Sequence, residues 1–146
     1  DDGAVVAISL AAQADINGCP SVKAEGAALL RETARQLDPY FARRLTVFDL
    51  PVRLEGSAFQ LKIWEVLRSI PYGKVVSYGE TAGRAGASRA AGGACHRNPV
   101  LIVVPCHRVV GADGSLTGFG AGLPLKRFLL AHEGLEFKDG GRLRMA

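Results

Sequence analysis

A run of five consecutive apolar residues, from Val100 to Val104, most restricts how this chain can fold. It has no polar face, so it must be buried on every side, as a central strand is. The strand predicted here leads directly into Pro-Cys-His-Arg at 105–108. A thiol and an imidazole are therefore expected at the edge of a rigid hydrophobic core.

Two capping signals predict helices ahead of this run. Ser57 is followed three residues later by Gln60, and Ser77 by Glu80. In such a capping box, side chains satisfy the free N–H groups at the start of a helix. Apolar residues then recur at helical spacing, at positions 59, 63, 66, 67 and 70, up to a Pro-Tyr-Gly stop at 71–73.

The second signal predicts a short helix to about Ala85, followed after Gly86 by another over about 88–96. Two short helices joined at a glycine suggest a helix-turn-helix, although purely structural helical hairpins share the pattern. A turn is expected at 111–114, and a last helix over about 123–133 that stops at Gly134. The basic tail, 137–146, is expected to be loose.

Residues 1–56 are predicted to form a first lobe of mixed character. Its expected elements are a strand at 4–10, a helix at about 22–37 and an extended stretch at 46–54. A chain of 146 residues can form one core or two small lobes. The second lobe is predicted to cover residues 57–146.

The net charge and the cysteines bear on the possible binding partner and on the cellular compartment. The net charge of +4 permits an anionic partner such as nucleic acid. Three cysteines cannot all pair, and none has a Cys-x-x-Cys spacing, which favours a reducing compartment, the cytoplasm or, in a eukaryote, the nucleus. The apolar N-terminal stretch is short and follows acids, unlike a signal peptide, and no run reaches the roughly 18 apolar residues of a membrane span.

Cys106 and His107 are the candidates for chemistry. A thiol acts as a nucleophile only as thiolate, so it needs a base, and the base needs an orienting group. His107 and Glu133 suit these roles, with His107 reaching Cys106 across a bend or through water. Glu133 lies in the last turn of its helix, where the helix dipole disfavours negative charge, and protonated His107 is a candidate partner. A buried structural thiol and a core histidine fit the local chemistry equally well.

Two further interpretations concern other polar residues. Cys95-His96 and Cys106-His107 form two Cys-His pairs, but adjacent ligands diverge, so structural zinc is disfavoured. A basic face could contact nucleic acid or simply be solvated; its members are Lys74, Arg84, Arg89, Arg97, Lys126 and Arg127. Tyr78 could equally be a packing residue at its helix start.

Several ordered motifs together resemble the O6-alkylguanine-DNA alkyltransferases. They cover most of residues 57–134 and begin with the Pro-Cys-His-Arg-Val signature at 105–109. The other matching stretches are Phe59-Gln60, Trp64, Ile70-Pro71-Tyr72-Gly73, Ser77-Tyr78-Gly79-Glu80, Arg89-Ala90-Ala91-Gly92-Gly93-Ala94, Asn98-Pro99, Gly118-Phe119-Gly120 and Leu129-Leu130-Ala131-His132-Glu133-Gly134. The segment from Tyr78 to Arg89 is a few residues shorter than is usual in this family.

The resemblance implies irreversible, single-turnover transfer of the alkyl group of O6-alkylguanine, and possibly of O4-alkylthymine, to Cys106. His107 would be the base acting through water and Glu133 its orienting group. Asn98 would brace the helix pair against the active-site loop. Tyr78 would help rotate the nucleotide and protonate the leaving guanine. No cofactor and no metal are implied.

The resemblance also implies a partner and a fold. The partner is double-stranded DNA, bound by a monomer through the minor groove with the damaged base flipped out. Arg89 would fill the gap in the base stack; Ala90, Gly92 and Arg97 would contact DNA, and Val109, Phe119 and Gly120 would line the pocket. The implied fold is α/β or α+β, with a ribonuclease-H-like first lobe and a helical second lobe containing a winged-helix-like helix-turn-helix.

Two other functions fit the same residues. The chain could be a non-catalytic module that binds and flags alkylated bases. It could also be a Cys-His-Glu hydrolase of acyl groups, which would need an oxyanion hole and would turn over repeatedly.

Overall fold

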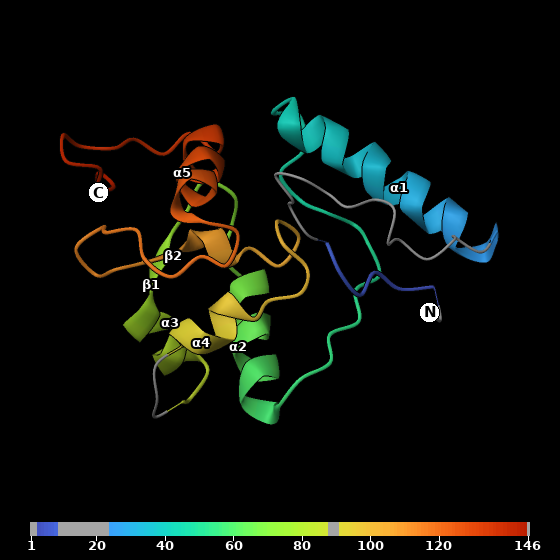
Figure 1. The fold of residues 1–146 in the computed structure, drawn as a ribbon, viewed down its shortest axis with the longest axis horizontal. Helices are drawn as coiled ribbons and strands as arrows, with labels where there is room; N and C mark the ends of the chain where they lie inside the picture. The colour runs from blue at the N-terminus through green and yellow to red at the C-terminus, as the bar shows by residue number, and fades with distance from the viewer. Residues whose placement is uncertain (1–2, 9–23, 88–90, 146) are drawn as a thin grey trace.

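The computed structural model describes residues 3–8, 24–87 and 91–145, in which helices surround a very small sheet (Figure 1). The helices are α1 (Ala24–Phe41), α2 (Ala58–Arg68), α3 (Tyr78–Arg84), α4 (Gly92–His96) and α5 (Leu123–His132). A short 3-10 helix, η2, spans Cys106–Arg108. In the described part of the chain, no helix is long and apolar enough to cross a membrane.

Both predicted capping signals lie at helix starts, and the first forms the complete reciprocal box, whereas the Glu80 side chain of the second pairs with Arg84 instead. The Ser57 hydroxyl accepts the Gln60 N–H, and the Gln60 side chain accepts the Ser57 N–H in return. The Ser77 hydroxyl likewise accepts the Glu80 N–H ahead of α3. Helix α2 buries one face, and the indole of Trp64 donates to the carbonyl of Ala94 at 2.9 Å, which joins α2 to α4. The two predicted helices are confirmed.

The sheet has two short parallel strands, β1 (Val76–Ser77) and β2 (Val109–Val110). Val76 pairs with Val109, and Ser77 with Val110. Helix α3 follows β1 directly, and η2 precedes β2 directly. Pairing of the two strands therefore places the start of α3 near the end of η2. Helix α5 lies beside this pair (Figure 1).

The predicted strand at 100–104 is wrong, although its burial was predicted correctly. Val100 forms one isolated bridge with Ile8, and the chain then turns, with the Val104 N–H donating to the Val100 carbonyl at 3.0 Å. Ile102 turns the backbone with a positive φ of 71° and is 1% exposed. A run of apolar residues specifies burial, but tertiary contacts determined the backbone hydrogen bonds here.

The expectation of a loose tail is also wrong for the described residues. Leu143 is 1% exposed and packs with Val110 and Leu130. Its N–H donates to the carbonyl of Gly114 at 2.9 Å, and it forms an antiparallel bridge with Phe137. The tail therefore covers a second, small hydrophobic cluster.

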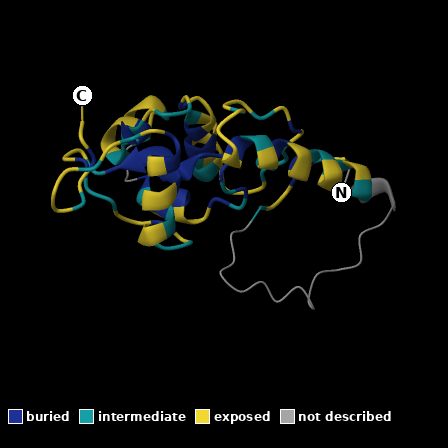
Figure 2. Cartoon of the chain, turned by 90° about the horizontal axis from the view of Figure 1, so that it is seen from above, coloured by how far each residue is buried: buried dark blue, intermediate teal, exposed yellow. Residues whose placement is uncertain are grey.

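In the first 56 residues, the described structure is helix α1 and extended segments. Helix α1 continues four residues beyond the predicted end, to Phe41, and passes through Pro39. The extended stretch at 46–54 forms a single bridge, from Val52 to Val5, and residues 9–10 of the predicted first strand lie outside the described residues. Figure 2 shows α1 extending from the part of the molecule in which buried residues are concentrated.

Candidate active site

Glu133 is the centre of a buried polar network. It is the C-terminal cap of α5, its side chain is fully buried, and its Oε1 lies 2.8 Å from His107 Nε2. Arg108 donates from Nη2 to the same oxygen at 2.8 Å and from Nε to Oε2 at 2.9 Å. The Tyr40 hydroxyl donates to Oε1 at 2.9 Å, and the Gly73 N–H to Oε2 at 3.1 Å. One carboxylate thus joins α1, η2, α5 and the turn after α2.

Glu133 is ionised in this network. Burial raises the pKa of its carboxyl, but hydrogen bonds from His107 and Arg108 outweigh burial and lower the pKa to about 2. The permanent positive charge of Arg108 therefore offsets the unfavourable position of Glu133 at the helix C-terminus. The sequence interpretation gave this role to His107 and missed Arg108, although it belongs to the same tetrapeptide.

His107 is a neutral imidazole with one free nitrogen. Burial lowers its pKa, only partly opposed by the hydrogen bond and charge of Glu133. Because ionised Glu133 can only accept, the proton of His107 lies on Nε2 and the lone pair on Nδ1. Nδ1 is buried and has no hydrogen-bond partner among the described residues. The basic nitrogen is thus available to another group.

Cys106 lies at the start of η2 and is 3% exposed. Burial raises the pKa of its thiol, while a hydrogen bond with the Asn98 side chain and the charge of Lys126 act in the opposite direction. Cys106 and His107 both belong to this short 3-10 helix, so the backbone between them is not extended. The thiol therefore needs a base before it can react, and both opposing groups favour its thiolate.

Asn98 holds the turn that leads to Cys106. Its Nδ2 donates to the carbonyl of Val104 at 2.6 Å, and its Oδ1 accepts the N–H of Val100 at 3.0 Å. The side chain replaces the backbone partners that a regular strand would supply. Asn98 lies two residues after the end of α4, so it connects this helix with the active-site turn.

Lys126 is a buried cation that the sequence interpretation placed on a solvent-facing basic surface, which is wrong. It is 0% exposed, and its Nζ donates to the Tyr78 hydroxyl at 3.0 Å and to the carbonyl of Thr117 at 2.9 Å. Burial lowers its pKa to about 8. Its position three and four residues before the buried Leu129 and Leu130 was a sequence signal for the inward face of α5.

Tyr78 begins α3 and is half-buried beside this lysine. Its hydroxyl donates to the carbonyl of Thr117 at 2.5 Å. Burial is the main cause of its raised pKa. Lys126 and Glu133 lie two turns apart on α5, so one helix faces Tyr78 near its start and His107 at its end.

The other predicted site residues lie around these groups. Val109 is fully buried and Phe119 is 8% exposed. Gly120 is exposed, and a Cβ there would lie 3.2 Å from the carbonyl of His96. Gly92 begins α4, and Arg97, its C-terminal cap, is exposed. Arg89 and Ala90 lie outside the described residues.

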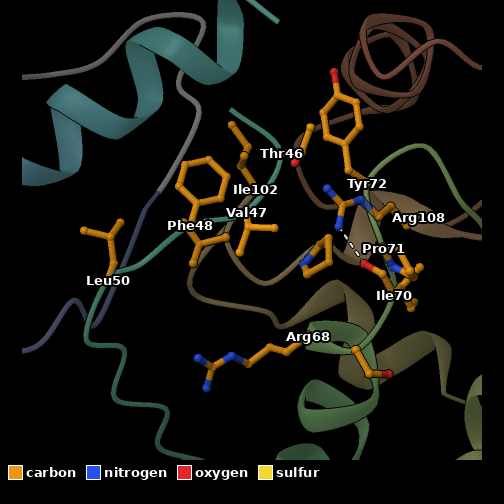
Figure 3. Close-up of a pocket in the computed structure, with 13 residues that line it drawn as sticks. Thr46, Val47, Phe48, Leu50, Arg68, Ile70, Pro71, Tyr72, Ile102 and Arg108 are labelled. Atoms are coloured by element: carbon orange, nitrogen blue, oxygen red, sulfur yellow. Dashed lines mark hydrogen bonds between the residues drawn. The ribbon is translucent and has the colours of Figure 1, made fainter. Parts of the chain in front are cut away.

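A cavity of about 540 Å³ is lined in part by Tyr72 and by Arg108, which belongs to the Glu133 network (Figure 3). It is bounded by residues 46–48 and 68–72 and by Arg108, whose Nη1 donates to the carbonyl of Ile70 at 2.7 Å. Neither Cys106 nor Tyr78 lines it. Among the described residues, no three His, Cys, Asp or Glu side chains are grouped so that they could hold a metal ion.

Comparison with known proteins gives consistent matches. A family model described as "6-O-methylguanine DNA methyltransferase, DNA binding domain" matches residues 58–135. The methylated-DNA--protein-cysteine methyltransferase of Methanosarcina acetivorans is 49% identical over 118 residues, which cover 79% of this chain and 76% of the relative. The protein of the same name from Mycolicibacterium paratuberculosis is 55% identical over 67% of this chain and 61% of its own length.

Among solved structures, Mycobacterium tuberculosis OGT in complex with DNA is similar with a TM-score of 0.68 and 48% sequence identity. The match covers 70% of this chain and 65% of that chain. The chain thus spans three quarters of the archaeal relative and less than two thirds of the mycobacterial ones.

Proposed function

The chain belongs to the O6-methylguanine DNA methyltransferase family, and from that premise we propose that it repairs DNA by moving the alkyl group of O6-alkylguanine irreversibly to Cys106. The observation that carries the proposal is the state of His107. Its Nε2 is held by ionised Glu133, its Nδ1 has no hydrogen-bond partner among the described residues, and Cys106, the preceding residue in η2, carries a buried thiol. This arrangement supplies what a thiol nucleophile lacks, an oriented neutral base.

The proposed reaction is a single displacement at the alkyl carbon. The Cys106 proton passes to His107 Nδ1, through a water molecule. The thiolate electron pair forms the S–C bond, the C–O6 bond breaks, and its electron pair remains on guanine. The product is a thioether, which water does not hydrolyse as it would a thioester. Each protein molecule therefore acts once, with no cofactor.

The departing guanine needs a proton, and we assign its delivery to Tyr78. Lys126 donates to the Tyr78 hydroxyl, which stabilises negative charge developing on that oxygen. The phenolic proton, now directed at Thr117, would turn to the flipped base. Lys126 thus has a positioning and electrostatic role in this proposal, and Tyr78 touches the substrate.

Double-stranded DNA is the proposed partner of α3 and α4. Cys106 is buried, so a base within a duplex can reach it only after flipping, which costs a few kcal/mol. Gly92 and Gly93 in α4 would permit close approach to the minor groove, with Arg97 beside the backbone and Arg89 in the vacated stack. The matched family model of a DNA-binding domain and the DNA complex of a relative support this partner.

We propose a monomer with two lobes, 1–56 and 57–146. The first lobe is assigned a ribonuclease-H-like fold and the second a winged-helix-like helix-turn-helix by the family resemblance. The described α3 and α4, which both contact α2, are compatible with the second assignment.

The test is the intact mass of the protein after incubation with a duplex containing O6-methylguanine. We expect a permanent gain of one methyl group, located on Cys106 by peptide mapping, and no gain in Cys106→Ala. Cys95→Ala, which removes the other described buried thiol, should still be methylated. Tight binding with unchanged mass would favour the non-catalytic module, and repeated acyl turnover without DNA binding would favour the hydrolase.

A further inference from the structure

Tyr40 brings a hydroxyl from the first 56 residues into the catalytic network. Three residues donate to Glu133 Oε1 from their side chains: His107 through Nε2, Arg108 through Nη2 and Nε, and Tyr40 through its hydroxyl. Tyr40 and Glu133 are 93 residues apart in the chain. The hydroxyl thus shares one oxygen atom with the imidazole that the proposed reaction uses as its base.

The surroundings hold Tyr40 firmly in this position. The residue is 0% exposed, and its ring meets those of Phe48 and Tyr72 with centroids 5.4 and 6.0 Å away. His132 Nε2 hydrogen-bonds its backbone carbonyl at 2.8 Å. A phenylalanine could make the same ring contacts. The difference between the two residues is the Tyr40 hydroxyl, and a buried phenol needs a hydrogen-bond partner. That partner is Glu133.

The Tyr40 hydroxyl remains a donor whenever the protein is folded. Burial and the charge of Glu133 both raise the pKa of Tyr40, so it does not ionise near neutral pH. Its O–H dipole presents its positive end to Oε1. Because both donors share this oxygen, the hydrogen bond from Tyr40 weakens the hydrogen bond that Oε1 accepts from the His107 N–H.

We infer that Tyr40 is a positioning residue that weakens the hold of Glu133 on a His107 proton, so that His107 stays neutral and its Nδ1 can accept the proton of Cys106. The role rests on the proposed function of His107. It also makes the first lobe part of the chemistry, since the hydroxyl comes from α1.

The other charged groups around His107 act in both directions. Glu133 favours the protonated imidazole, whereas Arg108 and Lys126 disfavour it. Cys106 is the adjacent titratable group in η2. Tyr72 and His132 flank Tyr40, and Tyr72 also lies under the Arg108 guanidinium at 5.8 Å. Among these neighbours, Tyr40 is a neutral donor on the same oxygen as His107.

The test is the titration of His107 by imidazole nitrogen NMR in the whole chain, without DNA, in Tyr40→Phe. We expect its pKa to rise by about one unit relative to the unmodified protein, since one donor to the carboxylate is lost. The acid limb of the transfer rate should move to higher pH by the same amount. Tyr72→Phe removes a neighbouring hydroxyl bound to the carbonyl of His132 and should leave both unchanged.

An unchanged His107 pKa in Tyr40→Phe would overturn the inference, even if the variant were less stable. Should Tyr40→Phe not fold, 3,5-difluorotyrosine at position 40 keeps the hydroxyl and makes it a stronger donor. The His107 pKa should then fall, and a rise would contradict the proposed role. Failure of methyl transfer in every protein would refute the proposed function, while the NMR titration would still decide the role of Tyr40.

Discussion

Lys126 is an unusual residue to bury, and its contacts explain how it is accommodated. Its ammonium group has the Tyr78 hydroxyl and the Thr117 carbonyl as acceptors, and it lies 5.3 Å from the centre of the Tyr78 ring. Burial nevertheless lowers its pKa to about 8, and its hydrogen-bond partners in the described part of the chain include no carboxylate that would oppose this shift. The charge is retained near neutral pH at a cost in stability, as expected for a functional group.

This pKa predicts a falling alkaline limb in the pH profile of alkyl transfer. The rate should rise from acid pH as His107 loses its proton, then fall above about pH 8 as Lys126 loses its charge. Lys126→Met should transfer more slowly and lack this alkaline limb, which single-turnover rates over a pH series would show. Lys62→Met, which removes an exposed lysine of α2, should keep the normal profile.

Protein stability gives a second measurement of the same group. The pKa of Lys126 is about 8 in the folded protein and 10.5 for an unperturbed lysine, so the unfolded chain binds more protons between these values. The free energy of unfolding contributed by Lys126 should therefore rise with pH across this window and be constant below it. A rise of the same size in Lys126→Met would contradict the assignment.

The turn after α4 depends on one amide side chain. Asn98 satisfies the Val104 carbonyl and the Val100 N–H, both buried, where the predicted strand would have used a neighbouring strand. This exchange allows the chain to reverse direction and place Cys106 at the start of η2. The position of the thiol is therefore determined by a loop that is ordered by its own side chain.

Asn98→Ala should lose stability and rate together. Two buried backbone groups would lose their partners, which should lower the free energy of unfolding by about 3 kcal/mol. Displacement of Cys106 should lower the transfer rate by roughly a hundredfold. Urea unfolding and single-turnover kinetics would measure both effects.

Ser57→Ala is the matched control for that prediction. It removes a helix cap far from the thiol in the chain, which should cost about 1 kcal/mol of stability. Its transfer rate should be unchanged. An equal loss of rate in the two variants would show that lower stability alone explains the effect of Asn98.

The sequence predicted local structure better than long-range contacts, for a physical reason. Ser57 with Gln60 and Ser77 with Glu80 act within four residues, so helix starts could be identified directly. The backbone partners of Val100–Val104 lie elsewhere in the chain, and the strand prediction failed there. The predicted pairing of His107 with Glu133 is present at 2.8 Å. Tyr40 and Arg108 also bind Glu133, through contacts that spacing in the sequence does not reveal.

The modest net positive charge of the protein bears on its proposed binding to DNA. A net charge of +4 is small, so the proposed interface must depend on where cations lie. Arg97 is exposed at the end of α4, next to the turn that Asn98 holds. A phosphate contact there would anchor α4 beside the active site without reading sequence.

Arg97→Ala should therefore weaken binding to undamaged duplexes of any sequence alike. The slope of log K against log salt should become shallower by about one, as expected for one lost phosphate contact. Fluorescence anisotropy over a salt series would measure it. Arg35→Ala is the control, because Arg35 is exposed on α1 and paired with Glu32. An unaltered slope in Arg97→Ala would exclude Arg97 from the interface.

Helix α5 carries Lys126 and Glu133 on one side, two turns apart. This spacing restricts insertions and deletions between the two residues. Insertion or deletion of one residue between them would rotate one group about 100° away from the other. Substitutions in α5 between these two positions should therefore be tolerated more readily than a change in its length.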